Sequence, residues 1–434
     1  MRIMILSPFT NGALREHLAF KEYGTFASTA IEKLGLSKSV IIKDAAPWVG
    51  QLIEELEKIP DVELYSVSPH IKLKDSIESF TLRKTKYYFY TSDFSMALRL
   101  LKKYPLWKVL QNCGRRVMRI ADEIKPDVVI AYGTENPVVS VPQLTLRKKY
   151  PVICVLQTIY NNPERVKYST PNPLIQNLEH DIVNNIRYFG TEDRLYYDLL
   201  KGMNIDAIAL EYPYPRAPLP IIPMPCKKYD FVNYAFNLDA RKGDEDAVRA
   251  LAIVKKTHSD VTLNMAGGMN PTRKTYIEGL VAELGLQDNV SFTPMFERKE
   301  DMYAHVLQAY CALLPVKLDL VSTTTRESMY YGMPVITNIT PATPLLNKDK
   351  QCVLLAEKGN IDSLSKCMLE VMENETLAKT LSENGHEYMV REMDNGPKMK
   401  RLMSSLQSVI DNYKEGTPIP HELLFDTDKH QLMA

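Results

Sequence analysis

A strand, helix, strand pattern around residue 320 constrains the fold more than any other feature of this sequence. The apolar run Cys311 to Val316 has the length of a buried strand, and Val335 to Thr337 is another short strand candidate. Between them, Thr324 is a candidate N-cap, and Gly332 followed by Pro334 is typical of a helix end. Such a unit belongs to α/β proteins, in which helix N-termini point at the carboxyl edge of a parallel sheet, where ligands bind.

The same alternation of apolar runs and helix-length segments extends along most of the chain. Candidate strands lie at Arg2–Leu6, 126–130, Val152–Val155, 230–235, 261–265 and 290–292. Helical patterns separate them, as expected of parallel strands joined by crossover connections. The sequence therefore predicts an α/β fold of two Rossmann-like, doubly wound domains facing each other across a cleft.

A proline-rich stretch predicts the domain boundary. Residues 212–225 contain six prolines, which donate no ladder hydrogen bonds and favour an extended chain. We predict an N-terminal domain over residues 1–212, a linker over 213–228 and a second domain over 229–395. A long helical region from Met389 to Tyr413 is expected to cross back to the first domain, so that residues 396–434 form this helix and a tail.

Composition narrows the class of protein. Lys plus Arg equals Asp plus Glu, 53 each, so the net charge indicates no particular partner. The six cysteines are scattered without C-x-x-C pairs, which argues for reduced core residues and against a disulfide or zinc framework. The N-terminal apolar run is too short for a signal peptide, and no stretch approaches about 20 apolar residues. We expect a soluble or peripheral protein in the cytoplasm.

Glu327 has two interpretations. Thr324-Thr325-Arg326-Glu327 has the pattern of a capping box, in which the glutamate only accepts a bond from the N-cap amide. However, Asp319 lies eight positions earlier, and S-M-Y-Y-G-M-P-V-I follows Glu327. Here the chain resembles the retaining glycosyltransferases of family 4, whose signature is two acidic residues with seven between them, then a small residue, a hydrophobic one and G-x-P-V. The resemblance favours a functional role for Glu327.

The resemblance implies the GT-B fold and a catalytic set of Lys242, Asp319 and Glu327. In the family, the lysine of the R-K-G segment contacts the donor phosphates, the first acidic residue meets the sugar hydroxyls, and the second binds the ribose. A lysine directly before a helix that begins Asp244-Glu245-Asp246 also favours an anion on local electrostatics. The alternative is a solvated lysine paired with those acids. Further donor-binding residues implied by the resemblance are Gly12, Asn237, Arg241, Gly267, Gly268, Phe296, Ser322 and Thr323.

The sequence departs from the family pattern at three places. Asn237 stands where the family has an arginine, so Arg241 is the alternative source of charge. Asp319 stands where the first glutamate is expected, and Leu320-Val321-Ser322-Thr323 replaces the usual glycines. The segment 156–161 contains no histidine where many members have one. The identity of the sugar is therefore left open.

No metal site and no cofactor are expected beyond the nucleotide sugar itself. The two D-x-D matches, at Asp244 and Asp426, lie at a predicted helix start and in the tail. The isolated histidines His17, His180 and His305 are predicted to be structural.

Residues 81–120 form a strongly basic segment. Ten Lys and Arg residues stand against Asp93 alone, a net charge of nine positive, and aromatic residues such as Tyr87, Tyr90 and Trp107 lie among them. This pattern suits an anionic membrane surface. The alternatives are a solvated face with buried aromatics, or nucleic acid, which we do not expect because no binding module accompanies the segment.

The expected function is a retaining, metal-independent hexosyltransferase. It would use a nucleoside diphosphate sugar and a glycan or lipid-linked acceptor in cell-surface polysaccharide or glycolipid synthesis, in the cytoplasm or peripherally on the inner membrane face. The alternatives are a catalytically degenerate GT-B protein that binds a nucleotide without turnover, and a nucleotide-sugar epimerase.

Overall fold

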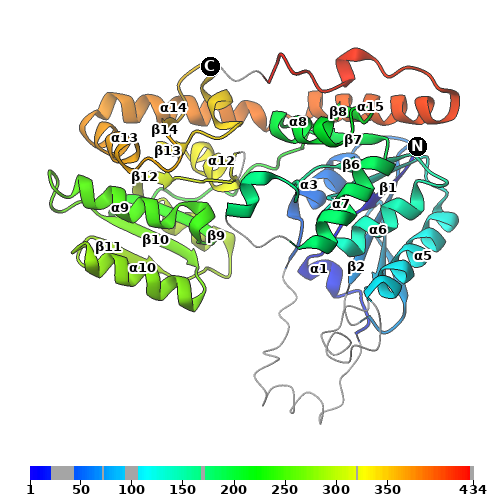
Figure 1. Ribbon diagram of the computed structural model, residues 1–434, viewed down its shortest axis with the longest axis horizontal. Coiled ribbons are helices and arrows are strands. Elements are labelled where there is room, and N and C mark those ends of the chain that lie inside the picture. The colour runs from blue at the N-terminus through cyan, green and yellow to red at the C-terminus, as the bar shows by residue number, and fades with distance from the viewer. Residues whose placement is uncertain (21–43, 71–72, 93–105, 168–171, 319–320, 431–434) are drawn as a thin grey trace, which may run out of the picture. The chain divides into compact units, whose positions relative to one another are not determined.

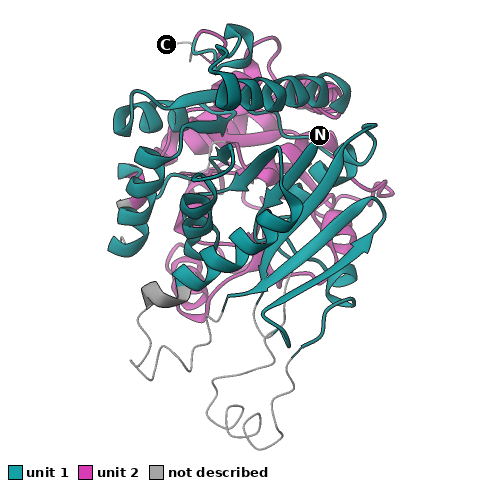
Figure 2. Cartoon of the chain, turned by 90° about the vertical axis from the view of Figure 1, so that its right-hand side faces the viewer, with its two compact units in different colours: residues 1–163, 170–216, 395–427 teal, residues 164–169, 217–394, 428–434 magenta. Residues whose placement is uncertain are grey.

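The computed structural model describes residues 1–20, 44–70, 73–92, 106–167, 172–318 and 321–430. The chain divides into two compact units (Figure 2). Unit 1 comprises residues 1–163, 170–216 and 395–427, and unit 2 comprises residues 164–169, 217–394 and 428–434. The main crossings between the units follow Arg216, inside the predicted linker, and Asp394.

Within the described residues, unit 1 is built on an eight-stranded sheet of order β3-β4-β2-β1-β5-β6-β7-β8 (Figure 1). The strands are β1 (Arg2–Leu6), β2 (Glu63–His70), β3 (Ile77–Leu82), β4 (Thr85–Thr91), β5 (Val128–Tyr132), β6 (Val152–Val155), β7 (Tyr188–Thr191) and β8 (Ile208–Glu211). All neighbouring pairs are parallel except β3 and β4. The order reverses between β1 and β5, as in a doubly wound sheet.

Helices cover both faces of this sheet. They are α1 (Gly12–Arg15), α3 (Pro47–Leu56), α5 (Leu106–Ile124), α6 (Pro137–Leu146), α7 (Pro173–Asn185), α8 (Arg194–Met203) and α15 (Asn395–Glu415). The apolar sides of α5, α6, α7 and α8 share one core with Met4 and Leu6. Those of α1, α3 and α15 share the other core with Ile3 and Ile5. The alternation of residues along β1 thus feeds two cores.

Unit 2 is built, over the described residues, on a six-stranded sheet of order β11-β10-β9-β12-β13-β14. Its parallel strands are β9 (Tyr229–Asn237), β10 (Leu263–Gly268), β11 (Val290–Thr293), β12 (Ala309–Leu314), β13 (Val335–Asn338) and β14 (Leu354–Ala356). Counted from β9, this is the 3-2-1-4-5-6 order of a Rossmann sheet. Its topological switch point lies between β9 and β12, which are hydrogen-bonded neighbours.

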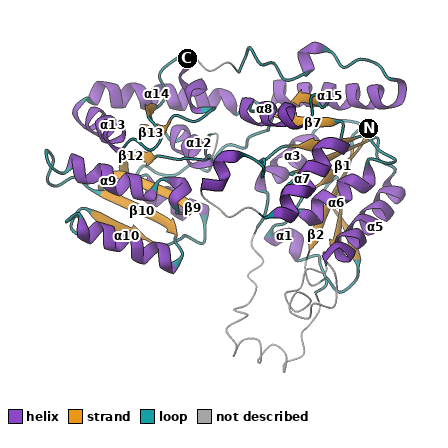
Figure 3. Cartoon of the chain, viewed as in Figure 1, coloured by secondary structure: helices purple, strands orange, loops and turns teal. Residues whose placement is uncertain are grey.

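The helices of unit 2 also form two layers around the strands (Figure 3). They are α9 (Asp244–Val254), α10 (Pro271–Glu283), α11 (Lys299–Val306), α12 (Thr323–Tyr330), α13 (Ile361–Glu373) and α14 (Glu375–Glu392). Helices α9, α10 and α13 share a core with Phe231 and Leu263. Helices α11 and α12 pack with Val232 and Leu314 on the other side. These two units confirm the predicted α/β class with two parallel-sheet domains.

One sequence prediction about secondary structure is wrong, and four aromatic residues of the basic segment follow the alternative of buried side chains. The single helix expected from Met389 to Tyr413 is two helices, because α14 ends at Glu392 and α15 begins at Asn395, at the crossing between the units. The basic segment 81–120 contains strand β4, whose Tyr87, Tyr88, Phe89 and Tyr90 are all buried. Those four aromatic side chains therefore belong to the core of unit 1 and do not face a membrane.

Candidate functional site

The candidate site of unit 2 lies at the switch point, where the chain leaves β9 and β12 at the carboxyl edge of the sheet. After β9 comes a 3-10 turn over Ala240–Lys242, followed by Gly243 and α9. After β12 comes the loop from Pro315 to the N-cap of α12. The two segments touch directly, because the Lys317 amide donates to the Arg241 carbonyl at 2.8 Å. In open α/β sheets this is the place where ligands bind.

Gly243 allows the two segments to approach. Its φ is 70°, in the left-handed region, and a Cβ built on it would lie 2.1 Å from the Pro315 carbonyl oxygen. Any other residue would force the turn and the loop apart. The glycine of the R-K-G segment is therefore required by the packing of the site.

The turn that carries Lys242 is held by Asp239. One Asp239 carboxylate oxygen accepts from the Arg241 amide at 2.9 Å, and the Asp239 carbonyl accepts from the Lys242 amide at 2.8 Å. The Arg241 guanidinium also binds this carboxylate, with Nη2 to Oδ2 at 2.6 Å. The guanidinium of Arg241, a predicted donor-binding residue, thus forms an ion pair with Asp239. Lys242 is half-buried and is the next residue along the turn.

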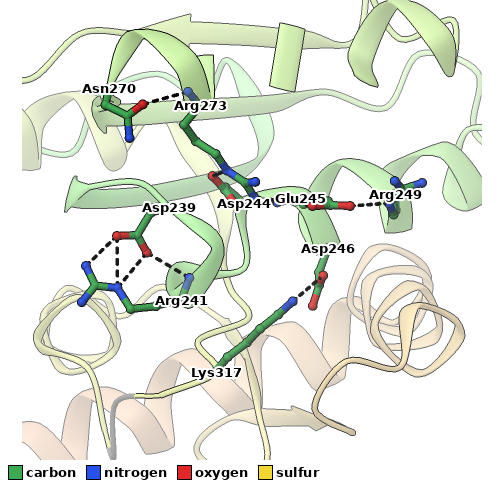
Figure 4. A network of polar contacts seen from close by, with 9 residues as sticks. All are labelled: Asp239, Arg241, Asp244, Glu245, Asp246, Arg249, Asn270, Arg273 and Lys317. Atoms are coloured by element: carbon green, nitrogen blue, oxygen red, sulfur yellow. Dashed lines mark hydrogen bonds and ion pairs between the residues drawn. The ribbon is translucent and has the colours of Figure 1, made fainter. Parts of the chain in front are cut away.

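The acids at the start of α9 are each bound by another cation (Figure 4). Asp244 is fully buried and binds Arg273 of α10, with Nε to Oδ2 at 2.9 Å. Glu245 pairs with Arg249 at 3.0 Å, and Asp246 pairs with Lys317 at 2.8 Å. Each of these acids therefore has a cation other than Lys242 as its partner. These ion pairs tie the first turn of α9 to α10 through Arg273 and to the loop after β12 through Lys317.

The structure excludes the capping box at Glu327. The N-cap of α12 is Ser322 and not Thr324, since the Ser322 hydroxyl accepts from the Thr325 amide at 3.1 Å. The Glu327 side chain instead accepts a hydrogen bond from the Tyr303 hydroxyl of α11 at 2.7 Å. Glu327 is thus freed from a capping role.

Glu327 is a buried carboxyl group, 7% exposed. Burial raises the pKa of Glu327 above its ordinary value, and the hydrogen bond from Tyr303 opposes that rise. Tyr234 of β9 bonds to helix α12, which carries Glu327. Its hydroxyl donates to the Thr324 carbonyl at 2.9 Å and lies 3.0 Å from the Ser328 hydroxyl. A carboxylate held this way has acceptor positions left for the hydroxyls of a ligand.

Other predicted donor-binding residues of unit 2 lie at the carboxyl ends of β9, β10 and β11. Asn237 is exposed and pairs in register with Gly268. Gly267 has a φ of 140°, and a Cβ there would lie 1.9 Å from the Ala235 carbonyl oxygen, so this strand end also depends on a glycine. Phe296 packs its ring against His305 at 5.2 Å between centroids.

His305 takes part in a network of polar side chains. Its Nε2 lies 3.0 Å from Asn264 Oδ1 and 3.1 Å from Thr293 Oγ1. Burial lowers the pKa of His305, and the charge of Lys228 adds to that effect. The ring therefore belongs to a polar network between β10 and β11.

The remaining residues predicted in α12 have different placements. Ser322 is buried as the N-cap, and Thr323 is exposed at the first helical position. Asp319 lies outside the described residues. The structure therefore brings together the Lys242 turn and the loop after β12 at Pro315 and Lys317, while the predicted sugar-binding carboxylate has no described geometry.

In unit 1 the predicted Gly12 is the first residue of α1, directly after the N-cap Asn11. The sequence analysis also missed a buried residue of unit 1. Glu179 of α7 is fully buried and accepts from the amides of Tyr160 and Asn161 at 2.8 and 2.7 Å. It also binds the Thr134 hydroxyl, and so it fixes the loop after β6 to the loop after β5. Only the unusual position of a glutamate on the apolar side of a helix, beside Leu178 and Ile182, signals this role.

The other two histidines named in the sequence analysis and the six cysteines have the following surroundings. His17 stacks on Phe80 at 4.7 Å, and His180 is exposed beside Asn184. All six cysteines lie in the described residues and are unpaired, with Cys226 alone exposed. In the described part of the chain, no group of His, Cys, Asp or Glu residues is arranged to hold a metal ion. Likewise, none of its helices has the length and apolar character needed to span a membrane.

Solved structures with the same fold include several enzymes. Sucrose-phosphate synthase from Thermosynechococcus elongatus matches with a TM-score of 0.63 and 15% identity, over 94% of this chain and 98% of that chain. The HepE protein of Anabaena in complex with UDP-glucose matches at 0.59 and 11% identity, over 94% and 100%. A UDP-N-acetylglucosamine 2-epimerase matches at 0.50 and 12% identity, over 96% and 98%. At these identities the likeness establishes the GT-B fold and not the reaction.

Sequence comparison gives a match for the part of the chain that holds the site. Residues 225–388 match the family model described as glycosyl transferases group 1. A search of curated protein sequences gives no match. The matched segment contains the Lys242 turn, the loop after β12 and helix α12 with Glu327, which are the elements gathered at the switch point of unit 2.

Proposed function

We propose that the chain is a retaining glycosyltransferase that moves a sugar from a nucleoside diphosphate sugar to a glycan or lipid-linked acceptor, in cell-surface polysaccharide or glycolipid synthesis. One observation carries the proposal. The turn with Lys242 and the segment leading to Glu327 are bonded together at the switch point of a Rossmann sheet, inside the segment that matches group 1 glycosyl transferases.

The chemistry of the site suits a nucleotide sugar. The Lys242 ammonium and the N-terminus of α9 supply positive charge for the diphosphate that leaves. The Glu327 carboxylate can accept hydrogen bonds from two vicinal ribose hydroxyls. Asp319 is proposed to meet the sugar, with Asn237 and the ends of β10 and β11 lining the donor. The leaving diphosphate itself is proposed to assist the acceptor, without a metal ion.

The first nucleotide to test is uridine diphosphate, since HepE was solved with UDP-glucose. Two alternatives have their own supporting observations. The structural likeness to an epimerase supports change of configuration without transfer. Asn237 in place of the expected arginine supports a degenerate nucleotide binder, because the amide brings no charge to the phosphates.

A donor panel separates these functions. The purified chain is examined by thermal shift with UDP-glucose, GDP-mannose, ADP-glucose and UDP-N-acetylglucosamine, and the ligands are then followed by mass spectrometry and NMR. Release of the nucleoside diphosphate, unchanged by EDTA, supports a metal-independent transferase. A new sugar configuration with the nucleotide still attached supports the epimerase. Binding of a donor that stays intact supports the degenerate alternative, and the absence of any binding refutes all three.

We further propose that the protein works in the cytoplasm, peripherally on the inner membrane face. Of the basic segment, residues 93–105 lie outside the described residues, and Lys86 pairs with Glu123. Arg115 and Arg119 of α5 are exposed one helical turn apart, and they are the proposed contacts for anionic lipid. Liposome flotation tests this, with the double variant R115Q/R119Q as the matched control. Equal flotation with and without anionic lipid contradicts the proposal.

A further inference from the structure

Lys317 makes two contacts across the candidate site. Its backbone amide donates to the Arg241 carbonyl at 2.8 Å, within the turn that carries Lys242. Its ammonium binds the Asp246 carboxylate in the first turn of α9 at 2.8 Å (Figure 4). One contact fixes a distance between two segments, whereas two contacts on either side of Gly243 also fix their orientation.

The ion pair is largely removed from water. The side chains of Lys317 and Asp246 are 17% and 10% exposed. A pair at this depth is screened little by salt, and loss of either partner leaves a buried charge without compensation. Lys317 and Asp246 therefore act as one unit.

The loop is also fixed from its other side. The Pro315 carbonyl accepts from the Asn338 side-chain amide of β13 at 2.9 Å, in a buried bond. Beyond Lys317, the same loop leads to Ser322, the N-cap of the helix with Glu327. The turn after β9 is thus held to β13 through the loop segment from Pro315 to Lys317.

We infer that Lys317 is a positioning residue: it holds the turn that carries Lys242 in a fixed place relative to the segment that leads into α12 and Glu327. The inference rests on the proposed function, because it assigns Lys242 and Glu327 to one donor. A donor held at both points must reach the correct geometry for transfer, and a misplacement of about 1 Å costs on the order of a hundredfold in rate.

The direct alternative is that the Lys317 ammonium itself binds the donor phosphates. Its charge already lies on Asp246, so that role requires the pair to break. The two roles predict opposite effects of losing Asp246. In the positioning role, loss of Asp246 impairs the site as loss of Lys317 does. In the phosphate-binding role, loss of Asp246 releases a cation and tightens nucleotide binding.

The test is a double-mutant cycle with K317M, D246N and K317M/D246N. The assay measures hydrolysis of whichever of UDP-glucose, GDP-mannose or ADP-glucose the wild-type chain hydrolyses, and calorimetry measures the Kd of the matching nucleoside diphosphate. We expect each single variant to lower kcat roughly ten- to a hundredfold, with KM and Kd within about threefold of wild type. The double variant should lose no more than the worse single one. K317R, which keeps the pair with Asp246, should recover most of the lost kcat.

R273M is the matched control, since it breaks the buried pair with Asp244 on the same helical turn but toward α10. It should lower Tm at least as far as K317M and leave kcat near wild type. R249M, which breaks the more exposed pair with Glu245, is the second control if R273M does not fold.

The outcomes are distinguishable. A wild-type chain that binds and hydrolyses none of the three donors overturns both the proposed function and this inference. If the wild type turns over and K317M retains its kcat, only the inference fails. It also fails if D246N lowers the Kd while K317M raises it, or if R273M loses as much kcat as K317M at equal Tm.

Discussion

Replacing Glu327 by glutamine should make the protein more stable and a poorer nucleotide binder. Glu327 is 7% exposed, and the Tyr303 hydroxyl donates to it at 2.7 Å. A buried carboxylate destabilises the fold when a single hydrogen bond from Tyr303 replaces its contacts with water. The neutral amide of glutamine keeps an oxygen that can accept from Tyr303. Removal of one incompletely satisfied buried charge should stabilise by about 1 kcal/mol. For a unit of this size that raises Tm by about 2–4 °C at neutral pH.

The pH dependence of this effect follows from the direction of the shift. Burial raises the pKa of Glu327 in the folded protein. The contribution of Glu327 to the stability of the wild type is therefore favourable below the ordinary pKa of glutamate, and it is lost as the pH rises through the raised pKa. The Tm difference between Glu327→Gln and wild type should therefore be small near about pH 4 and reach its full size at neutral pH.

The same substitution should weaken nucleotide binding. Hydrogen bonds to a charged group contribute about 1.5–3 kcal/mol, so loss of the carboxylate should raise the Kd for UDP roughly tenfold to a hundredfold. Differential scanning fluorimetry across pH and calorimetry with UDP measure the two effects. A variant that is less stable at pH 7 and binds UDP as the wild type does would refute the assignment of Glu327 to the donor.

Three further predictions concern the supports of the site. Tyr303→Phe removes the hydrogen-bond donor to Glu327, so it should lower the free energy of unfolding by about 1.5–3 kcal/mol at neutral pH. It should also raise the pKa of Glu327 further. Calorimetry should detect this as UDP binding that weakens more at pH 6 than at pH 8. Gly243→Ala should lower Tm by several degrees, at a cost of about 2 kcal/mol or more, whereas Gly279→Ala, in open space on α10, should stabilise by about 0.5–1 kcal/mol. Glu179→Gln should cost about 2–4 kcal/mol in urea unfolding, because the amide cannot accept from all the donors that the buried carboxylate accepts from.

Each of these has an outcome that contradicts it. If Tyr303→Phe binds UDP as the wild type does at both pH values, the Tyr303 hydroxyl does not support nucleotide binding by Glu327. Equal Tm changes for the two glycine variants would show that the approach at Gly243 is not tight. An unfolding midpoint unchanged by Glu179→Gln would show that the loop after β6 does not depend on that carboxylate.

The fold was predictable because parallel strands leave a strong pattern. Buried on both faces, they appear as short apolar runs, and β1 and β6 have the bounds expected from such runs. Strand β4 was missed for a physical reason. Its tyrosines are amphipathic and its flanks carry Arg83, Lys84 and Lys86, a composition that also suits an interface. Only the pairing of β4 with β2 and β3 settles that these rings enter the core.

The sequence predicts positions for the candidate site but not the contacts between them. Ser322, Thr323, Thr324 and Thr325 all carry hydroxyls, so the sequence offers several N-caps, and the buried bonds of Ser322 select one. The partners of Glu327 and Asp246 lie 24 and 71 residues away in the chain. Such pairings depend on the order of strands in the sheet, which local patterns do not encode.

The most direct test of retaining transfer by this chain is a time course of donor turnover by ¹H NMR. The wild-type chain is mixed with UDP-glucose, whose glucose is α-linked, or with the donor selected by the panel. A retaining transferase should release the nucleoside diphosphate together with a sugar that appears first as the anomer of the donor, before mutarotation. Glu327→Ala should not form this sugar. First appearance of the opposite anomer, or a donor that stays intact, would contradict retaining transfer.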